Sequence, residues 1–182
     1  MGRSYYYFVA TLPMIRFDDK MPMSVEDYLL DCQRLLTPGD FRVANGLVSG
    51  DFEAAFKGNA FVRKWMNFEG CFRNEIAWYR SEKYHKNLDV LRGEPPCDMT
   101  IVGIIEQADE AENLLEAEKI IDQAKWHFLD QEDSRYQFTF ENIIIFGLKL
   151  KIVERYQAIY SERGPQRLRD LRDIVLSDMI LK

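Results

Sequence analysis

Three charged residues fall within the apolar stripe of one long predicted helix and are the strongest candidates for chemistry. At about 100° per residue, Glu69, Arg73 and Arg80 share the arc that also holds Trp65 and Ile76. Charged groups in an apolar arc are costly unless paired. Glu69 and Arg73 are spaced i,i+4, and Arg80 follows two turns later, so one network could join them. The pattern predicts a buried polar network, or alternatively a carboxylate–arginine site for binding or catalysis.

Trp78 is a second candidate on the same predicted helix. It lies on the side opposite to Trp65, away from the apolar stripe. Because Trp is enriched at the hot spots of protein interfaces, Trp78 is a candidate for partner binding. The alternative is a second packing contact within the fold.

Charge is segregated along the chain. Eight acidic residues and no Lys or Arg occur between Gly93 and Glu118, whereas four arginines follow closely spaced near the C-terminus: Arg163, Arg167, Arg169 and Arg172. Patches of opposite sign steer partners toward each other, so these arginines are candidates for partner binding. The alternative is solvated faces with charges that favour helix ends.

Signatures of catalysis and of bound cofactors are missing from the sequence. Neither GxxxxGK nor GxGxxG occurs. His85 and His127 lie on separate predicted helices, whereas a zinc site needs three or four converging ligands. Cys32, Cys71 and Cys97 are odd in number and lack CxxC spacing, which fits a reducing cytoplasm rather than a disulfide scaffold. We therefore expect no metal, no cofactor and no enzymatic activity.

Composition limits the class of protein and of partner. The 182 residues fit one globular domain, with 47% hydrophobic and 30% charged residues. A net charge of −6 argues against nucleic acid, whose binding depends on clustered Lys and Arg. The most apolar run, 143–153, contains Lys149 and Lys151 and is about half the ~20 residues of a spanning helix. The apolar run 5–10 is too short and aromatic for a signal peptide. We expect no direct membrane insertion.

Apolar spacing of three and four predicts helices along most of the chain. Ser24 with Asp27 forms an N-cap for a helix at 25–36, which Thr37 to Asp40 then break. Further helices are predicted over 41–48, 59–86, 109–130, 140–163 (with Thr139 as cap) and 167–181, and 99–105 is either a helical turn or an extended piece. No strand pattern occurs. The prediction is an all-α helical bundle of about six helices, three of them long, in a single domain over 1–182 with a possible sub-division near 92–98.

Four stretches of the chain resemble an uncharacterised bacterial family whose genes lie inside V-type ATP synthase operons. They are YYYFVATLP at 5–13, FRNEIA at 72–77, NLLEAEK at 113–119 with Trp126 seven residues later, and FGLKLKIVERY at 146–156. Their order and spacing match over most of the chain. The family members look like shortened relatives of the C subunit of V/A-type ATPases, an all-helical adaptor that seats the central shaft on the membrane rotor ring.

The resemblance implies a non-catalytic, C-subunit-like adaptor or accessory factor that couples soluble stalk subunits to the rotor ring of a proton- or sodium-transporting ATP synthase. Its expected partners are the stalk and rotor-ring subunits of the V-type ATPase. Its expected location is cytoplasmic and peripheral at the membrane through that complex. One alternative is an assembly or regulatory factor that leaves the mature complex. The other is a small enzyme that uses the Glu69–Arg73 site.

Overall fold

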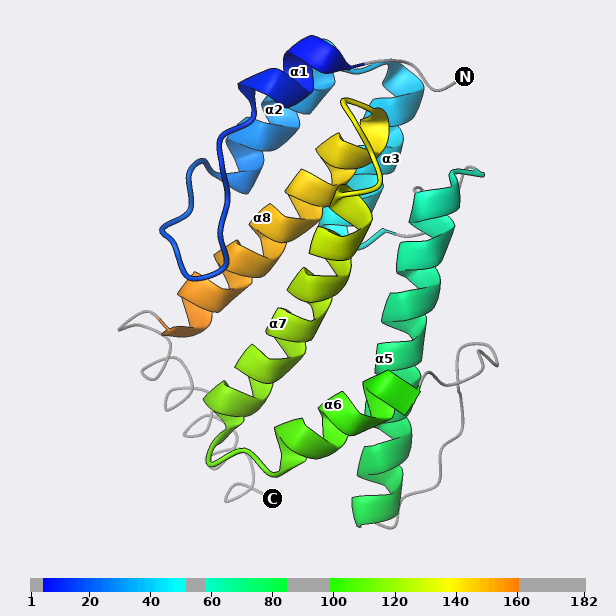
Figure 1. Ribbon diagram of the computed structural model, residues 1–182, viewed down its shortest axis with the longest axis vertical. Helices are drawn as coiled ribbons and strands as arrows, with labels where there is room; N and C mark the ends of the chain where they lie inside the picture. The colour runs from blue at the N-terminus through cyan, green and yellow to red at the C-terminus, as the bar shows by residue number, and fades with distance from the viewer. Residues whose placement is uncertain (1–4, 52–57, 85–98, 161–182) are drawn as a thin grey trace, which may run out of the picture.

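Helices make up the regular structure of the residues that the computed structural model describes, which are 5–51, 58–84 and 99–160 (Figure 1). They are α1 (Tyr6–Thr11), α2 (Val25–Leu35), α3 (Pro38–Ser49), α5 (Ala60–Tyr84), α6 (Met99–Asp109), α7 (Leu114–Asp133) and α8 (Phe140–Tyr160). Within these ranges there is no β-sheet, and the long helices are α5, α7 and α8, so the predicted all-α class is confirmed. The predicted helix at 167–181 and the possible sub-division near 92–98 lie outside the described residues.

Helix caps explain where several helices begin. The Ser24 side chain accepts a hydrogen bond from the Asp27 N–H at the start of α2, as predicted. Thr37 does the same for the Asp40 N–H, and Pro38 occupies the first turn of α3. The predicted break after α2 is therefore present, but the predicted start of the next helix at residue 41 is wrong, because α3 begins at Pro38.

The chain between residues 99 and 133 forms two helices, although the sequence did not decide whether residues 99–105 are helical or extended. Residues 99–105 are helical, and α6 continues to Asp109. The predicted helix start at 109 is wrong, because α7 begins at Leu114. The Asn113 side chain caps α7 by accepting a hydrogen bond from the Glu116 N–H. A polar connection of four residues thus turns the chain from α6 into α7.

Helix α8 is the centre of the larger hydrophobic core. It packs against α1, α2, α3 and α7 (Figure 1). Every residue from Ile143 to Leu150 is buried, on all sides of the helix. A helix that is apolar all round is expected in the middle of a core. The buried Lys149 is the exception in this stretch, and it forms ion pairs with α7.

Close packing between Tyr28 and Gly147 joins α2 to α8. The buried Tyr28 hydroxyl donates a hydrogen bond of 2.8 Å to the Ile143 carbonyl. Its ring lies so close to Gly147 that a Cβ added there would meet three ring atoms at 2.7 Å. Only glycine permits this approach, since real Cβ contacts at that distance essentially do not occur.

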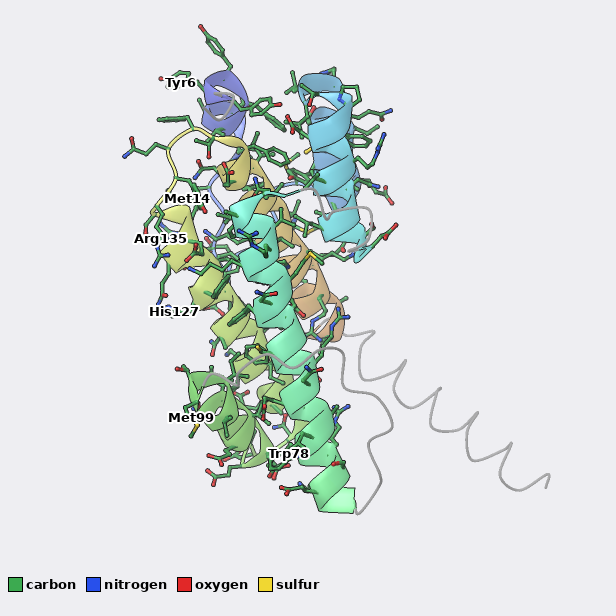
Figure 2. All side chains as sticks on the ribbon, turned by 90° about the vertical axis from the view of Figure 1, so that its right-hand side faces the viewer. Tyr6, Met14, Trp78, Met99, His127 and Arg135 are labelled. Atoms are coloured by element: carbon green, nitrogen blue, oxygen red, sulfur yellow. The ribbon has the colours of Figure 1, made fainter. Side chains whose placement is uncertain are left out.

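A smaller core cluster joins α5, α6 and the first half of α7. Its buried members are Cys71, Phe72, Ile101 and Ile105. Phe68 packs against both clusters and stacks on Phe128 of α7 with ring centroids 4.0 Å apart. The molecule is therefore elongated, with α1 at one end and the C-terminal half of α5 at the other (Figures 1 and 2).

Candidate functional site

Glu69 is buried in an ion-pair cluster between α5 and α7. Its Oε1 lies 2.7 Å from Lys125 Nζ, and its Oε2 lies 3.7 Å from Arg73 Nε. The pairing of Glu69 with Arg73 agrees with the sequence prediction. The expectation that Arg73 is largely buried is wrong, because its side chain is 53% exposed. Lys125 is the closer partner, and sequence spacing could not reveal it because it comes from another helix.

Arg80 does not take the place in this cluster that the sequence suggested. It is exposed and lines a separate cleft of 310 Å³, together with Lys83 and Asp109. The reason is distance along the helix, since seven residues advance α5 by ~10 Å. The predicted three-residue polar network is therefore limited to Glu69 and Arg73, with Lys125 as the additional member.

A second buried carboxylate lies close to the first. Asp122 is almost fully buried, and its Oδ1 accepts a hydrogen bond of 2.5 Å from Arg155 Nη2 of α8. Arg155 Nη1 donates a second bond, of 2.8 Å, to Glu118. Burial raises the pKa of Asp122 above its ordinary 3.8, and the hydrogen bond and charge of Arg155 offset this only in part. Sequence analysis missed both Asp122 and Arg155.

These two carboxylates line one cavity of 250 Å³, here called the charged cleft. Its walls come from the C-terminal end of α3 and from α5, α7 and α8. The charged lining residues are Glu69, Arg73, Asp122, Lys125, Lys151 and Arg155, and the apolar wall includes Trp65, Leu148 and Ile152. The arrangement can bind a charged ligand. Both carboxylates of the cleft already form ion pairs, Glu69 with Lys125 and Asp122 with Arg155.

Trp78 lies exposed toward one end of the molecule. The residue is 47% exposed, which favours a surface anchor over a packing contact. Met99, the first residue of α6, is 79% exposed toward the same end (Figure 2). We call Trp78 and Met99 the tryptophan end.

The opposite end carries an aromatic cluster that the sequence did not reveal. Tyr6 and Tyr7 of α1 are exposed and pack edge to face, and Phe138 lies 4.5 Å from the Tyr6 ring. Phe138 has a φ of 54°, which is uncommon for a bulky residue. Its carbonyl accepts a hydrogen bond from the Tyr5 N–H, which helps to hold this loop conformation. Tyr6, Tyr7 and Phe138 are called the tyrosine end, and Tyr6 marks its place in Figure 2.

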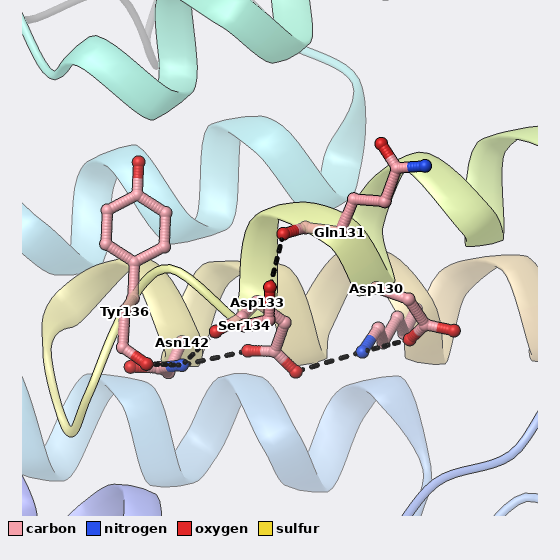
Figure 3. Close-up of polar contacts among 7 residues, drawn as sticks. Asp130, Gln131, Asp133, Ser134, Tyr136 and Asn142 are labelled. Atoms are coloured by element: carbon pink, nitrogen blue, oxygen red, sulfur yellow. Dashed lines mark hydrogen bonds and ion pairs between the residues drawn. The ribbon is translucent and has the colours of Figure 1, made fainter.

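A third polar cluster joins the end of α7 to the start of α8 (Figure 3). The buried Lys149 Nζ lies 2.7 Å from Asp130 and 3.0 Å from Asp133, and also over the ring of Trp126. Asn142 Nδ2 donates to Asp133 Oδ1 at 2.8 Å. Because these groups satisfy one another, the cluster stabilises the α7–α8 turn rather than offering a site.

The remaining histidine, cysteine and arginine candidates lie partly within the described residues and partly outside them. His127 is exposed and hydrogen-bonds to Gln131 within the same helix. The described residues contain no group of three or more His, Cys, Asp and Glu placed to hold a metal ion, and none of their helices is long and apolar enough to cross a membrane. Outside the described residues lie His85, Cys97, Arg163, Arg167, Arg169 and Arg172.

Comparison with known protein families gives one match. Residues 99–177 match a family model described as a protein of unknown function, DUF2764. The match begins at the first residue of α6, includes α7 and α8, and extends past the described residues. Comparison with curated proteins and with solved structures finds no match. Over α6 to α8, the chain is therefore similar to a family to which no function is assigned.

Proposed function

We propose that this chain is a non-catalytic helical adaptor subunit or accessory factor of a V-type ATP synthase. In that role it joins soluble stalk subunits to the membrane rotor ring, and it lies in the cytoplasm at the membrane through the complex. The class of partner rests on the resemblance of the four sequence stretches. The single structural observation that carries the proposal is the pair of exposed apolar ends, one at each end of the molecule.

The two ends have the composition of protein-binding surfaces. Aromatic side chains and methionine are enriched in protein interfaces, and Trp and Tyr dominate binding hot spots. Tyr7 is 86% exposed and Met99 79%, although both side chains would gain from leaving water. The strained Phe138 backbone supports the same view, because backbone outliers concentrate at functional sites.

The separation of the ends fits a protein that bridges two partners. Helix α5 alone has 25 residues, which corresponds to about 37 Å at the rise of an α-helix. Trp78 lies toward its C-terminal end, whereas the tyrosine end lies beyond its N-terminal end (Figure 2). One partner could therefore bind at each end without contact between the two partners.

The test is affinity capture of ATP synthase subunits by variants of each end. We expect the double variant Tyr6→Ser/Tyr7→Ser to lose one partner and Trp78→Ser/Met99→Ser to lose a different one. A lost hot spot weakens binding by about 2 kcal/mol or more, roughly 30-fold. Leu30→Ser is the matched control, because Leu30 is a similarly exposed apolar residue on α2. Equal capture by all variants and the control would contradict the proposal.

A further inference from the structure

The charged cleft has an excess of positive charge. Two lysines and two arginines line it, against one glutamate and one aspartate. The C-terminal end of α3 also faces the cleft, and a helix C-terminus contributes only about half a negative charge. The residues that line the cleft are therefore net positive even after this contribution, although Glu118 and Glu154, outside the lining, pair with Arg155 and Lys151, and the whole chain is acidic, at −6.

The charges are sorted by depth. Glu69 and Asp122 are buried, whereas the side chains of Arg73, Lys151 and Arg155 are each about half exposed. An entering ligand thus meets the cations before it meets either carboxylate. The buried carboxylates hold Lys125 and Arg155 in place, because each forms an ion pair with one of them.

Two of the cations, Lys125 and Lys151, retain capacity to bind a further anion. Lys125 has three N–H donors, and its ion pair with Glu69 uses one of them. Lys151 pairs with Glu154 at 2.8 Å on the surface of α8, and an exposed i,i+3 pair of this kind is weak. A multiply charged anion can outcompete such a weak partner.

We infer that the charged cleft binds a phosphate group. Arginine and lysine together bind phosphate oxygens by charge-assisted hydrogen bonds, which are the stronger class of hydrogen bond. The cavity of 250 Å³ is below the ~300–1,000 Å³ typical of sites for drug-sized ligands. It therefore fits a small phosphate anion, or the phosphate end of a larger molecule. This inference does not depend on the partner proposed above.

The experiment is isothermal titration of the full chain with inorganic phosphate at low ionic strength, because salt screens such contacts. We expect saturable binding with one site per chain. Arg73→Gln and Lys151→Gln should each weaken it about tenfold, the loss expected from one charge-assisted hydrogen bond. Arg63→Gln is the matched control, since Arg63 is exposed on the same helix as Arg73 but does not line the cleft.

Each outcome decides the inference. Absence of saturable phosphate binding, equal weakening by Arg63→Gln, or binding that neither cleft variant weakens would overturn it. A parallel titration with ATP distinguishes the two sources of the phosphate. Equal or weaker affinity for ATP indicates free phosphate as the ligand, whereas tighter binding that still depends on Arg73 and Lys151 indicates a phosphate carried on a larger molecule.

Discussion

Replacing Gly147 by alanine tests the contact that fixes α2 on α8. The new Cβ would lie 2.7 Å from three atoms of the Tyr28 ring. The ring cannot rotate away easily, because Tyr28 is fully buried and its hydroxyl is bonded to the Ile143 carbonyl. Relief requires a shift of α2 against α8, and overpacking of this kind costs ~1–3 kcal/mol.

A smaller gain opposes this cost, because alanine favours a helix over glycine by roughly 0.5–1 kcal/mol. The overpacking term is the larger of the two, so we expect a net loss of about 1–2 kcal/mol in the free energy of unfolding. For a chain of this size that loss lowers the melting temperature by about 2–8 °C.

The assay is thermal denaturation followed by circular dichroism, with Gly103→Ala as the matched control. Gly103 is also helical, but a Cβ there meets nothing within 4 Å. The control should therefore show the helix-propensity gain alone and melt at or above the wild-type temperature. If Gly147→Ala also melts at or above wild type, the Tyr28 ring does not restrict position 147 and the reasoning is refuted.

Three further predictions concern buried charge. Glu69→Gln should lower the free energy of unfolding by about 1–3 kcal/mol, because Lys125 loses its partner. Arg73→Gln should lower it by under ~1 kcal/mol, because the Arg73 side chain is half-exposed. Equal losses for the two variants in urea titrations would contradict this prediction. Lys149→Met leaves Asp130 without its lysine and Asp133 with only its Asn142 hydrogen bond, and should cost ~1–3 kcal/mol. The exposed Lys151→Met should cost about 0.5 kcal/mol or less, and thermal melts compare the two variants. Because the folded pKa of Asp122 is raised, the stabilising contribution of this residue is full below its ordinary pKa of 3.8 and is lost as pH rises through the folded pKa. The wild-type protein should therefore lose stability relative to Asp122→Asn between these two pH values. A difference in stability that stays constant across a pH series would refute this prediction.

Four of the helices could be predicted from sequence because their signals are local. Apolar spacing marked α2, α5, α7 and α8, and caps such as Ser24 are read within four residues. Helix α1 was missed because six residues are too few to show a helical period. The boundary between α6 and α7 was misplaced because residues 109–113 contain no Gly or Pro, and only Asn113 marks the new helix.

For the candidate sites too, only the contacts within one helix could be predicted from sequence. Glu69 and Arg73 are one helical turn apart, so their pairing was predictable. Lys125 and Arg155 reach the charged cleft from other helices, and no spacing rule relates them to α5. Likewise Tyr6 and Phe138 meet only after α1 packs beside the start of α8. Sites made by tertiary packing follow from the structure, whereas sites within one helix follow from the sequence.

The most direct test of the adaptor proposal is the quantitative composition of the complex that the chain forms in its own cells. The tagged native protein is purified from membranes under mild conditions, and the bound subunits are quantified by mass spectrometry. The proposal predicts stalk and rotor-ring subunits of a V-type ATP synthase in a fixed ratio to the chain. A substoichiometric and variable amount would indicate an assembly or regulatory factor. Capture without any ATP synthase subunit would contradict the proposal.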